Sequence, residues 1–314
     1  MPLLALAGVA VVVATNAGEV GAALELISLR ALAALAALHL LALTLRAAAW
    51  GLCLRAAGAP VPARDLHTTS GFRFLADTLV PTYAGAWVRI GLLKRLLAAR
   101  SPTVGQMISA DAVILLVEAV ITVVLVVTVT ATLGLEWWLP LVVAALAAAG
   151  AAFAWTMRRR FAHRPFVRTL DVLTHSRRLL PFAALLALVL AVQPLRFWIA
   201  LQAVGFDPSA FEALLTFIVT SLYGGLPIGP GPASVGATAS VFGAEGLGAA
   251  AAAGLVLAAT AFVAASAYAA WAALALVLGG NGQPTDPVDP LRDLAAEPLE
   301  NGREEVGGTQ RTLG

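Results

Sequence analysis

The sequence predicts an all-α polytopic membrane protein with about six transmembrane helices and two re-entrant hairpins that proline and glycine interrupt. Of the 314 residues, 60% are hydrophobic and 12% charged, whereas soluble domains have roughly 25% charged residues. The mean hydropathy is +0.88. Residues 221–236, SLYGGLPIGPGPASVG, hold three prolines and five glycines between two apolar stretches. Because an interior proline removes a hydrogen bond and clashes with the preceding turn, no continuous helix passes through this run.

Six apolar stretches approach the length of about 20 residues that crosses a bilayer as a helix. They cover residues 2–17, 29–57, 104–133, 137–157, 181–205 and 246–279. Residues 19–28 are expected to form a short interfacial connection between the first two. We therefore expect a membrane domain over 1–279. Residues 280–314 carry four prolines and seven acidic residues against three arginines, which predicts a disordered cytoplasmic tail.

The segment 158–178 sets the predicted orientation. It contains seven arginines and one acidic residue, Asp171. Because positively charged loops stay in the cytoplasm, we interpret it as a solvated cytoplasmic loop of a multi-pass plasma (inner) membrane protein. Specific binding of anionic lipid is the alternative. Counting spans and hairpins from there places both termini in the cytoplasm.

Two hairpins are predicted around breaks in the chain. Residues 66–100 are interrupted by Pro81 and Gly85 and have basic residues on both flanks, so both ends lie on one side of the membrane. The second hairpin, within 209–244, opens from the other side. A new half-helix is expected to begin at Gly231 and to direct free N–H groups at the break, where an anion is favoured. Interrupted segments in both halves are the pattern of inverted-repeat transporters. A Pro/Gly loop outside the bilayer is the alternative reading.

Charged residues inside the predicted spans need partners. A charge at mid-span costs roughly 2.5 to 3.5 kcal/mol. We expect Arg46 to face protein or water, and Asp111 and Glu118, which share a helix face, to face the interior. At least one of these acids should lie close to an arginine of the first hairpin or of the fifth span. The alternatives are that the second span ends before Arg46 and that Glu118 only fixes neighbouring helices.

The sequence contains no recognisable set of catalytic residues. It contains no Walker loop, dinucleotide fingerprint, nucleophile elbow or zinc motif. The single cysteine, Cys53, excludes an internal disulfide, and the four histidines have no metal-ligand spacing. We therefore predict no catalytic residues, no metal, no cofactor and no nucleic-acid partner.

Three motifs carry a resemblance to a known family. The first is Arg46 to Trp50 together with Arg55. The second places Pro81, Gly85, Arg89 and Leu93 in the order P-x-x-x-G-x-x-x-R-x-x-x-L, and the third is Pro227-x-x-Pro230-Gly231. Over 1–279 the chain resembles the transmembrane region of the lysylphosphatidylglycerol synthase family, a flippase-like integral membrane family. It departs from the family pattern at Ala86, Ala112, Pro232, Ser234 and Ala237, and its last span lacks the family's arginine.

The resemblance implies translocation of a membrane lipid between leaflets. Because the chain offers several cations and two half-helix ends, we expect a lipid with an anionic or phosphate-bearing head group, and no enzymatic activity. The expected substrate-binding residues are Arg46, Arg73, Arg89, Arg196, Pro81, Gly85, Pro227, Pro230, Gly231 and Ser234. Asp77, Asp111 and Glu118 would balance charge or carry coupling protons.

Two other functions stay open. The first is a non-transporting scaffold subunit for a cell-envelope lipid or glycan synthesis enzyme, which the missing acidic positions favour. The second is an intramembrane lipid-modifying enzyme, for which no nucleophile can be named. Full-length synthases also carry a soluble aminoacyltransferase domain, so we expect no aminoacyl-lipid synthesis by this chain alone.

Overall fold

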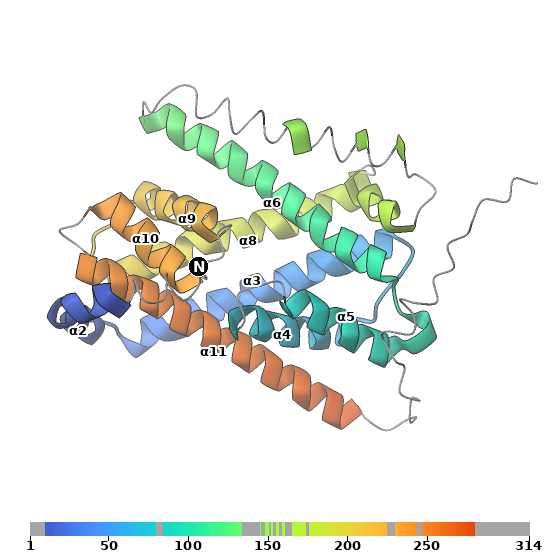
Figure 1. Ribbon diagram of the computed structural model, residues 1–314, viewed down its shortest axis with the longest axis horizontal. Helices are drawn as coiled ribbons and strands as arrows, with labels where there is room; N and C mark the ends of the chain where they lie inside the picture. The colour runs from blue at the N-terminus through green and yellow to red at the C-terminus, as the bar shows by residue number, and fades with distance from the viewer. Residues whose placement is uncertain are drawn as a thin grey trace, which may run out of the picture. The chain divides into compact units, whose positions relative to one another are not determined.

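Every regular element in the described part of the chain is helical (Figure 1). The computed structural model describes residues 10–79, 84–133, 145, 148–150, 152, 155–156, 159–160, 165–173, 176–224, 230–243 and 247–279. The α-helices are α2 (Ala17–Glu25), α3 (Leu29–Ala56), α4 (Ala63–Leu79), α5 (Ala84–Leu97), α6 (Val104–Leu133), α8 (Ser176–Ala203), α9 (Ala210–Gly224), α10 (Pro230–Phe242) and α11 (Leu247–Gly279). Two short 3-10 helices, η1 (Ala98–Arg100) and η2 (Pro165–Leu173), join them.

Four helices, α3, α6, α8 and α11, are long and apolar enough to cross a membrane. They correspond to the second, third, fifth and sixth predicted spans, so these predictions are confirmed to within a few residues. Ser28 caps the first of the four, because its Oγ accepts a hydrogen bond from the Ala31 N–H at 3.2 Å, as helix N-caps commonly do. The spans predicted over 2–17 and 137–157, and the tail 280–314, lie largely outside the described residues.

Two pairs of short helices stand where the hairpins were predicted. Helices α4 and α5 pack against each other and form the first hairpin, and α9 and α10 form the second. Helix α10 begins at Pro230, close to the predicted start of the half-helix. Figure 1 shows the first hairpin opening at the end of the bundle where α3 ends, and the second at the end where α3 begins. The connecting residues, 80–83 with Pro81 and 225–229 with Pro227, lie outside the described residues.

Both hairpins pack on the uncharged helix α11. A Cβ atom on Gly71 of α4 would lie 2.9 Å from the Tyr268 carbonyl oxygen, and one on Gly254 would lie 2.5 Å from Cγ2 of Val235 in α10. Small residues therefore let the helices approach closely, as is typical of helix packing in membranes. Helix α11 is thus the common support of the two hairpins.

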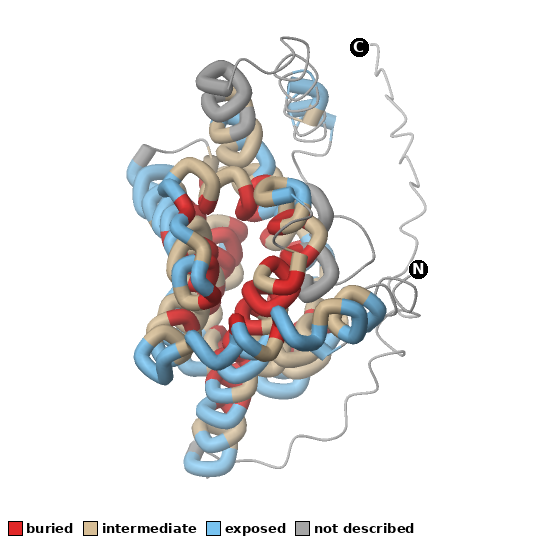
Figure 2. Tube along the Cα trace, turned by 90° about the vertical axis from the view of Figure 1, so that its left-hand side faces the viewer, coloured by how far each residue is buried: buried red, intermediate tan, exposed pale blue. Residues whose placement is uncertain are grey.

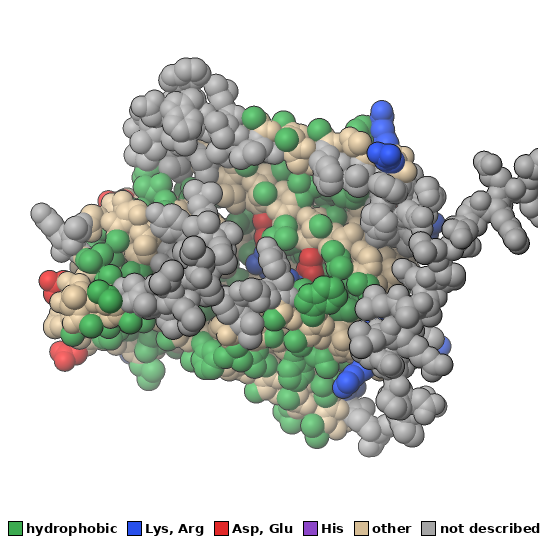
Figure 3. All heavy atoms as spheres, viewed as in Figure 1, with side chains coloured by type: hydrophobic (Ala, Val, Ile, Leu, Met, Phe, Trp, Pro, Cys, Tyr) green, Lys and Arg blue, Asp and Glu red, His purple; other side chains and the backbone are tan. Residues whose placement is uncertain are grey.

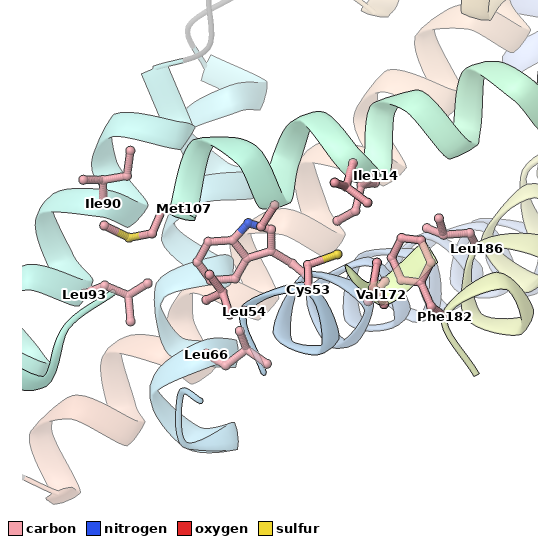
Figure 4. Close-up of a cluster of buried hydrophobic side chains, with 14 residues drawn as sticks. Cys53, Leu54, Leu66, Ile90, Leu93, Met107, Ile114, Val172, Phe182 and Leu186 are labelled. Atoms are coloured by element: carbon pink, nitrogen blue, oxygen red, sulfur yellow. The ribbon is translucent and has the colours of Figure 1, made fainter. Parts of the chain in front are cut away.

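The largest hydrophobic cluster lies where α3 meets the first hairpin, α6 and α8 (Figure 4). Its large fully buried side chains include Trp50, Leu93, Met107 and Phe182. Figure 2 shows buried residues on the inner faces of the helices and exposed residues on their outer faces. Deep apolar packing of this kind fixes the helices that carry the charged residues described below.

The prediction of a solvated loop over 158–178 is wrong for residues 165–173. These residues form η2, which packs against α3, α6 and α8. Thr169 and Val172 are fully buried, whereas Arg168 remains exposed. Leu170, Val172 and Leu173 join the largest hydrophobic cluster, since their burial removes apolar surface from water.

The predicted interfacial connection over 19–28 also has more structure than expected. Helix α2 occupies most of it, with Val20 and Ala23 buried, and it packs on α11. The approach is close, because a Cβ atom on Gly248 would lie 2.5 Å from Cβ of Glu19.

The two ends of the bundle carry opposite charge (Figure 3). At the end where α3 stops, the charged residues that are not buried are Arg55, Arg64, Asp65, Lys94, Arg95, Arg100, Arg168, Asp171, Arg177 and Arg178. At the other end they are Glu19, Glu25, Arg30, Asp207 and Glu212. This asymmetry is the one that the positive-inside rule associates with a cytoplasmic basic end. The orientation itself stays a prediction.

Candidate functional site

Six charged side chains from four helices meet between the first hairpin, α3 and α6. We call them the charge cluster: Arg46, Arg73, Asp77, Arg89, Asp111 and Glu118. Three arginines face three carboxylates, so the cluster is formally neutral. Within a bundle of apolar helices, such pairing is the expected way to lower the cost of charge.

Arg89 of α5 is the most enclosed member of the cluster. Its Nη2 donates to both carboxylate oxygens of Asp111, at 2.6 and 2.5 Å. Its guanidinium carbon lies 3.5 Å from the centroid of a Trp50 ring, which is a cation–π contact. Only 2% of the Arg89 side chain is exposed. Arg89 is therefore held between an aromatic face and a carboxylate.

Arg73 of α4 links the two acids nearest to the first hairpin. Its Nη1 donates to Asp111 Oδ1 at 2.6 Å, and its Nε donates to Asp77 Oδ2 at 3.3 Å. The other oxygen of Asp77 accepts a hydrogen bond from the Gly85 N–H at 3.0 Å. Asp77 thereby joins the two helices of the hairpin close to their break.

Gly85 explains part of the spacing in the second motif. A Cβ atom at this position would collide with the carbonyl oxygen of Arg73, and would lie 2.6 Å from Cγ of Asp77. Gly85 and Arg89 are four residues apart, so they share one face of α5. The glycine lets α5 approach α4, and the arginine one turn later reaches Asp111.

Arg46 of α3 pairs with Glu118 of α6. Glu118 also lies within electrostatic reach of Arg73 and Asp111, which makes the ion pairs one network. The prediction that an acid of the third span lies close to an arginine of the first hairpin is confirmed by Asp111. Arg46 lies within α3, which continues to Ala56; where the membrane span ends along this helix stays a prediction.

The exposed fraction of the arginine side chains rises across the charge cluster from Arg89 to Arg46. The exposed fraction of the side chain is 19% for both Arg73 and Asp111, 35% for Asp77 and 38% for Arg46. Figure 3 shows acidic and basic side chains at the bottom of a hollow near the centre of one face, among hydrophobic side chains. The cluster is thus open at Arg46 and Asp77 and closed at Arg89.

Arg196 lies apart from these ion pairs, on α8. Its Nη1 donates to the Gln193 side-chain oxygen at 2.8 Å, and its Nε is buried without a hydrogen-bond partner. Of the four predicted arginines, three are therefore brought together and the fourth is placed elsewhere.

The second hairpin contributes backbone rather than charge. Pro230 and Gly231 form the first turn of α10. Ser234 is buried, and its Oγ would lie 3.1 Å from a Cβ atom on Gly254. In α9 the acid Glu212 caps its own helix, because its Oε2 accepts from the Ser209 N–H at 2.7 Å, an arrangement known as a capping box.

Three contacts between the first hairpin and α11 were not predicted. His67 Nδ1 lies 2.5 Å from the Tyr268 hydroxyl, and Arg64 donates to the Ala275 carbonyl oxygen. The rings of Phe74 and Tyr268 stack with centroids 6.1 Å apart. No sequence signal identifies these partners, since about 200 residues separate them. Among the described residues, no three His, Cys, Asp or Glu side chains are placed to hold a metal ion.

One comparison with known proteins finds a match. The family model for the lysylphosphatidylglycerol synthase TM region matches residues 3–279. No curated protein and no solved structure matches the chain. The matched region contains every described helix, both hairpins and the whole charge cluster. The chain therefore belongs to the lysylphosphatidylglycerol synthase TM region family.

Proposed function

We propose that this protein moves a lipid with an anionic head group from one leaflet to the other, and that the charge cluster contacts the head group. The observation that supports this proposal most directly is a set of ion pairs that lies between apolar helices and is nevertheless partly exposed at Arg46 and Asp77. Exposed charge in such surroundings is favoured where water or a polar head group enters. Membership of a lipid-related membrane family supports the same function. In this proposal the chain acts as a carrier and not as an enzyme.

Arg46 makes the first contact with the head group. It is the most exposed arginine of the cluster, and Glu118 is its one carboxylate partner among the described residues. A phosphate displaces Glu118 and accepts two parallel hydrogen bonds from the guanidinium. Glu118, then without its cation in apolar surroundings, is stabilised by taking up a proton. The exchange of partners couples head-group binding to proton uptake.

Arg89 has a positioning role in this proposal. Its contacts with Asp111 and Trp50 already occupy its guanidinium. It orients Asp111, which in turn holds Arg73 beside the open part of the cluster. The first turn of α10 supplies a second anion-favouring element, because its N–H groups have no partners within the helix.

Leaflet exchange in proteoliposomes tests the proposal. Wild-type protein should move fluorescently labelled phosphatidylglycerol, and Arg46→Gln should slow this exchange by about tenfold or more, since hydrogen bonds to charged groups are worth that much. Arg55→Gln is the matched control, because Arg55 is exposed near the end of the same helix. Equal rates for wild type and Arg46→Gln would contradict the assignment of the site.

A scaffold function is the second candidate, and the neutrality of the cluster favours it. All three arginines have carboxylate partners, so holding α3, α6 and the first hairpin together would be a sufficient role for the pairs. Such a subunit would bind a cell-envelope lipid or glycan synthesis enzyme. It predicts no leaflet exchange by the wild type, together with co-purification of that enzyme from the membrane.

A further inference from the structure

We propose a second anion site, formed by Arg196, Gln193 and His39, that binds the phosphate group of an anionic lipid. We call it the Arg196 site. The proposal rests on the lipid-carrier function and extends it, because it assigns a separate contact for the head group on the other half of the bundle.

The guanidinium group of Arg196 has a hydrogen-bond donor without a partner. Its residue surface is 4% exposed, and its Nε has no partner. Gln193 occupies Nη1. Nη2 has no hydrogen-bond partner among the described residues. The free edge therefore comprises Nε and Nη2, which together form the two-pronged donor that binds a carboxylate or a phosphate side-on. A neutral amide oxygen satisfies one donor but leaves the charge uncompensated.

His39 of α3 lies level with this edge. Helices α3 and α8 run antiparallel and pack along their lengths: Leu35 clusters with Phe197, and Ala42 clusters with Val189 and Val192. His39, between Leu35 and Ala42, therefore falls beside the stretch from Gln193 to Arg196. Arg196 acts on His39 electrostatically, and the buried Nδ1 of His39 has no hydrogen-bond partner. An imidazole with its hydrogen on Nδ1 can donate to the same anion.

The missing counter-charge points to a ligand. Among the residues that the structure describes, no carboxylate lies within salt-bridge distance of Arg196, in contrast to Arg46, Arg73 and Arg89. A buried charge without a partner is strongly unfavourable. An anion that binds the free edge of Arg196 removes that cost and satisfies the unpaired donors at the same time.

The Arg196 site and the charge cluster occupy opposite halves of the bundle. Arg196 lies seven residues, or about 10 Å, before the end of α8, at the acidic end of the bundle. Asp111 lies seven residues, or about 10 Å, after the start of α6, at the basic end. Between them, His39 is within electrostatic reach of Arg46. His39 therefore lies between the two sets of cations along α3.

The site is closed in this conformation. Atoms around the Arg196 Nε exclude water, and the neighbouring Phe197 packs against Phe217 of the second hairpin with ring centroids 6.1 Å apart. Pro194 interrupts the hydrogen bonding of α8 two residues before Arg196, and a proline of this kind permits bending. Movement of α9 away from α8 would open the contact of Phe197 with Phe217 beside the site.

Lipid binding to the purified full-length protein in detergent tests the site directly. Native mass spectrometry measures the retention of phosphatidylglycerol and phosphatidylcholine, and the unfolding temperature is measured with each lipid and with inorganic phosphate. Both lipids are measured in the Arg46→Gln background, which removes the proposed head-group contact at the charge cluster. In this background the protein should bind phosphatidylglycerol about tenfold or more tightly than phosphatidylcholine, and Arg196→Met should lose this preference. Arg196→Lys should retain part of it, because lysine keeps the charge without the planar fork.

Arg30→Met is the matched control, since Arg30 is exposed at the start of α3 in the same half; it should bind like the Arg46→Gln protein. If Arg196→Met does not fold, Arg196→Lys and Gln193→Leu provide the comparison. An unchanged preference for phosphatidylglycerol in the folded variants would overturn the site. Equal stabilisation by inorganic phosphate and phosphatidylglycerol would overturn the lipid assignment. Loss of the preference in Arg196→Met, with no leaflet exchange by wild type, would retain the site and refute the carrier function.

Discussion

The two hairpins have the same kind of break but are held by different forces. The first hairpin is tied to α6 by the ion pairs of Arg73 and Arg89 with Asp111, and to α3 by the contact of Arg89 with the Trp50 ring. In the described part of the second hairpin, the one charged residue is Glu212, and its side chain caps its own helix. It is held by apolar contacts such as Phe206 with Phe242, whose ring centroids are 4.7 Å apart. A break thus fixes where helices end, while the residues on its flanks decide what the hairpin can bind.

The difference has energetic consequences. Removing one member of a buried ion pair leaves the other charge uncompensated, at a cost of about 3–5 kcal/mol. Crowding an apolar helix contact costs about 1–3 kcal/mol. We therefore expect the first hairpin to be more sensitive to single substitutions than the second.

The largest effect is expected at Asp111. Asp111→Asn removes the counter-charge of Arg89 and one of the two carboxylate partners of Arg73, and should lower the free energy of unfolding by about 3–5 kcal/mol. Equilibrium unfolding in detergent measures the change. The double variant Asp111→Leu with Arg89→Met should recover part of the loss, because it removes the stranded charge. An unchanged unfolding midpoint for Asp111→Asn would show that the pairs do not hold the first hairpin.

The next effect is expected at Gly85. In Gly85→Ala the new methyl group meets the Arg73 carbonyl oxygen, so the free energy of unfolding should fall by about 2–3 kcal/mol. Gly91→Ala on the same helix is the control, because nothing lies within 4 Å of a Cβ atom there; it should be neutral or slightly stabilising. Equal thermal shifts for the two variants would refute the close contact between α4 and α5.

Gly254 tests the corresponding contact of the second hairpin. Gly254→Ala brings a methyl group against a Val235 side-chain methyl rather than against a carbonyl oxygen, so a smaller loss of about 1–2 kcal/mol is expected. Gly21→Ala, with open space around its Cβ position, is the control for thermal unfolding. A loss larger than that of Gly85→Ala would reverse the ranking of the two hairpins.

The smallest effect is expected where the first hairpin meets α11. Tyr268→Phe removes the hydroxyl that lies 2.5 Å from His67 Nδ1 while it keeps the ring beside Phe74. The free energy of unfolding should fall by about 1 kcal/mol. His67→Phe in the Tyr268→Phe background should add little if this hydrogen bond is the relevant contact. A large additional loss would mean that His67 has another stabilising role.

Local features of the sequence were sufficient to predict the long helices. The four apolar runs gave the bounds of α3, α6, α8 and α11, because length and composition decide which helices cross a membrane. The cost of a lone charge also predicted that Asp111 would lie close to a hairpin arginine.

Contacts between distant residues could not be predicted in the same way. Periodicity does not say which arginine meets which acid, so the pairing of Arg46 with Glu118 and the position of Trp50 over Arg89 came only from the structure. Because 158–178 contains seven arginines, a solvated loop was predicted there. The apolar residues of η2 that join the hydrophobic cluster were therefore not predicted to be buried. The roles of Pro81, Pro227 and Gly231 in binding stay predictions.

Photolabelling of the protein in membranes can locate the head group. The probe is a phosphatidylglycerol with a photoreactive head group, and mass spectrometry identifies the labelled peptides, with unlabelled phosphatidylglycerol as competitor. Labelling that the competitor removes is expected around Arg46 on α3 and Asp77 on α4, the open part of the charge cluster. Labelling confined to the exposed ends of the bundle, with none near these two residues, would contradict a head-group site at the first hairpin.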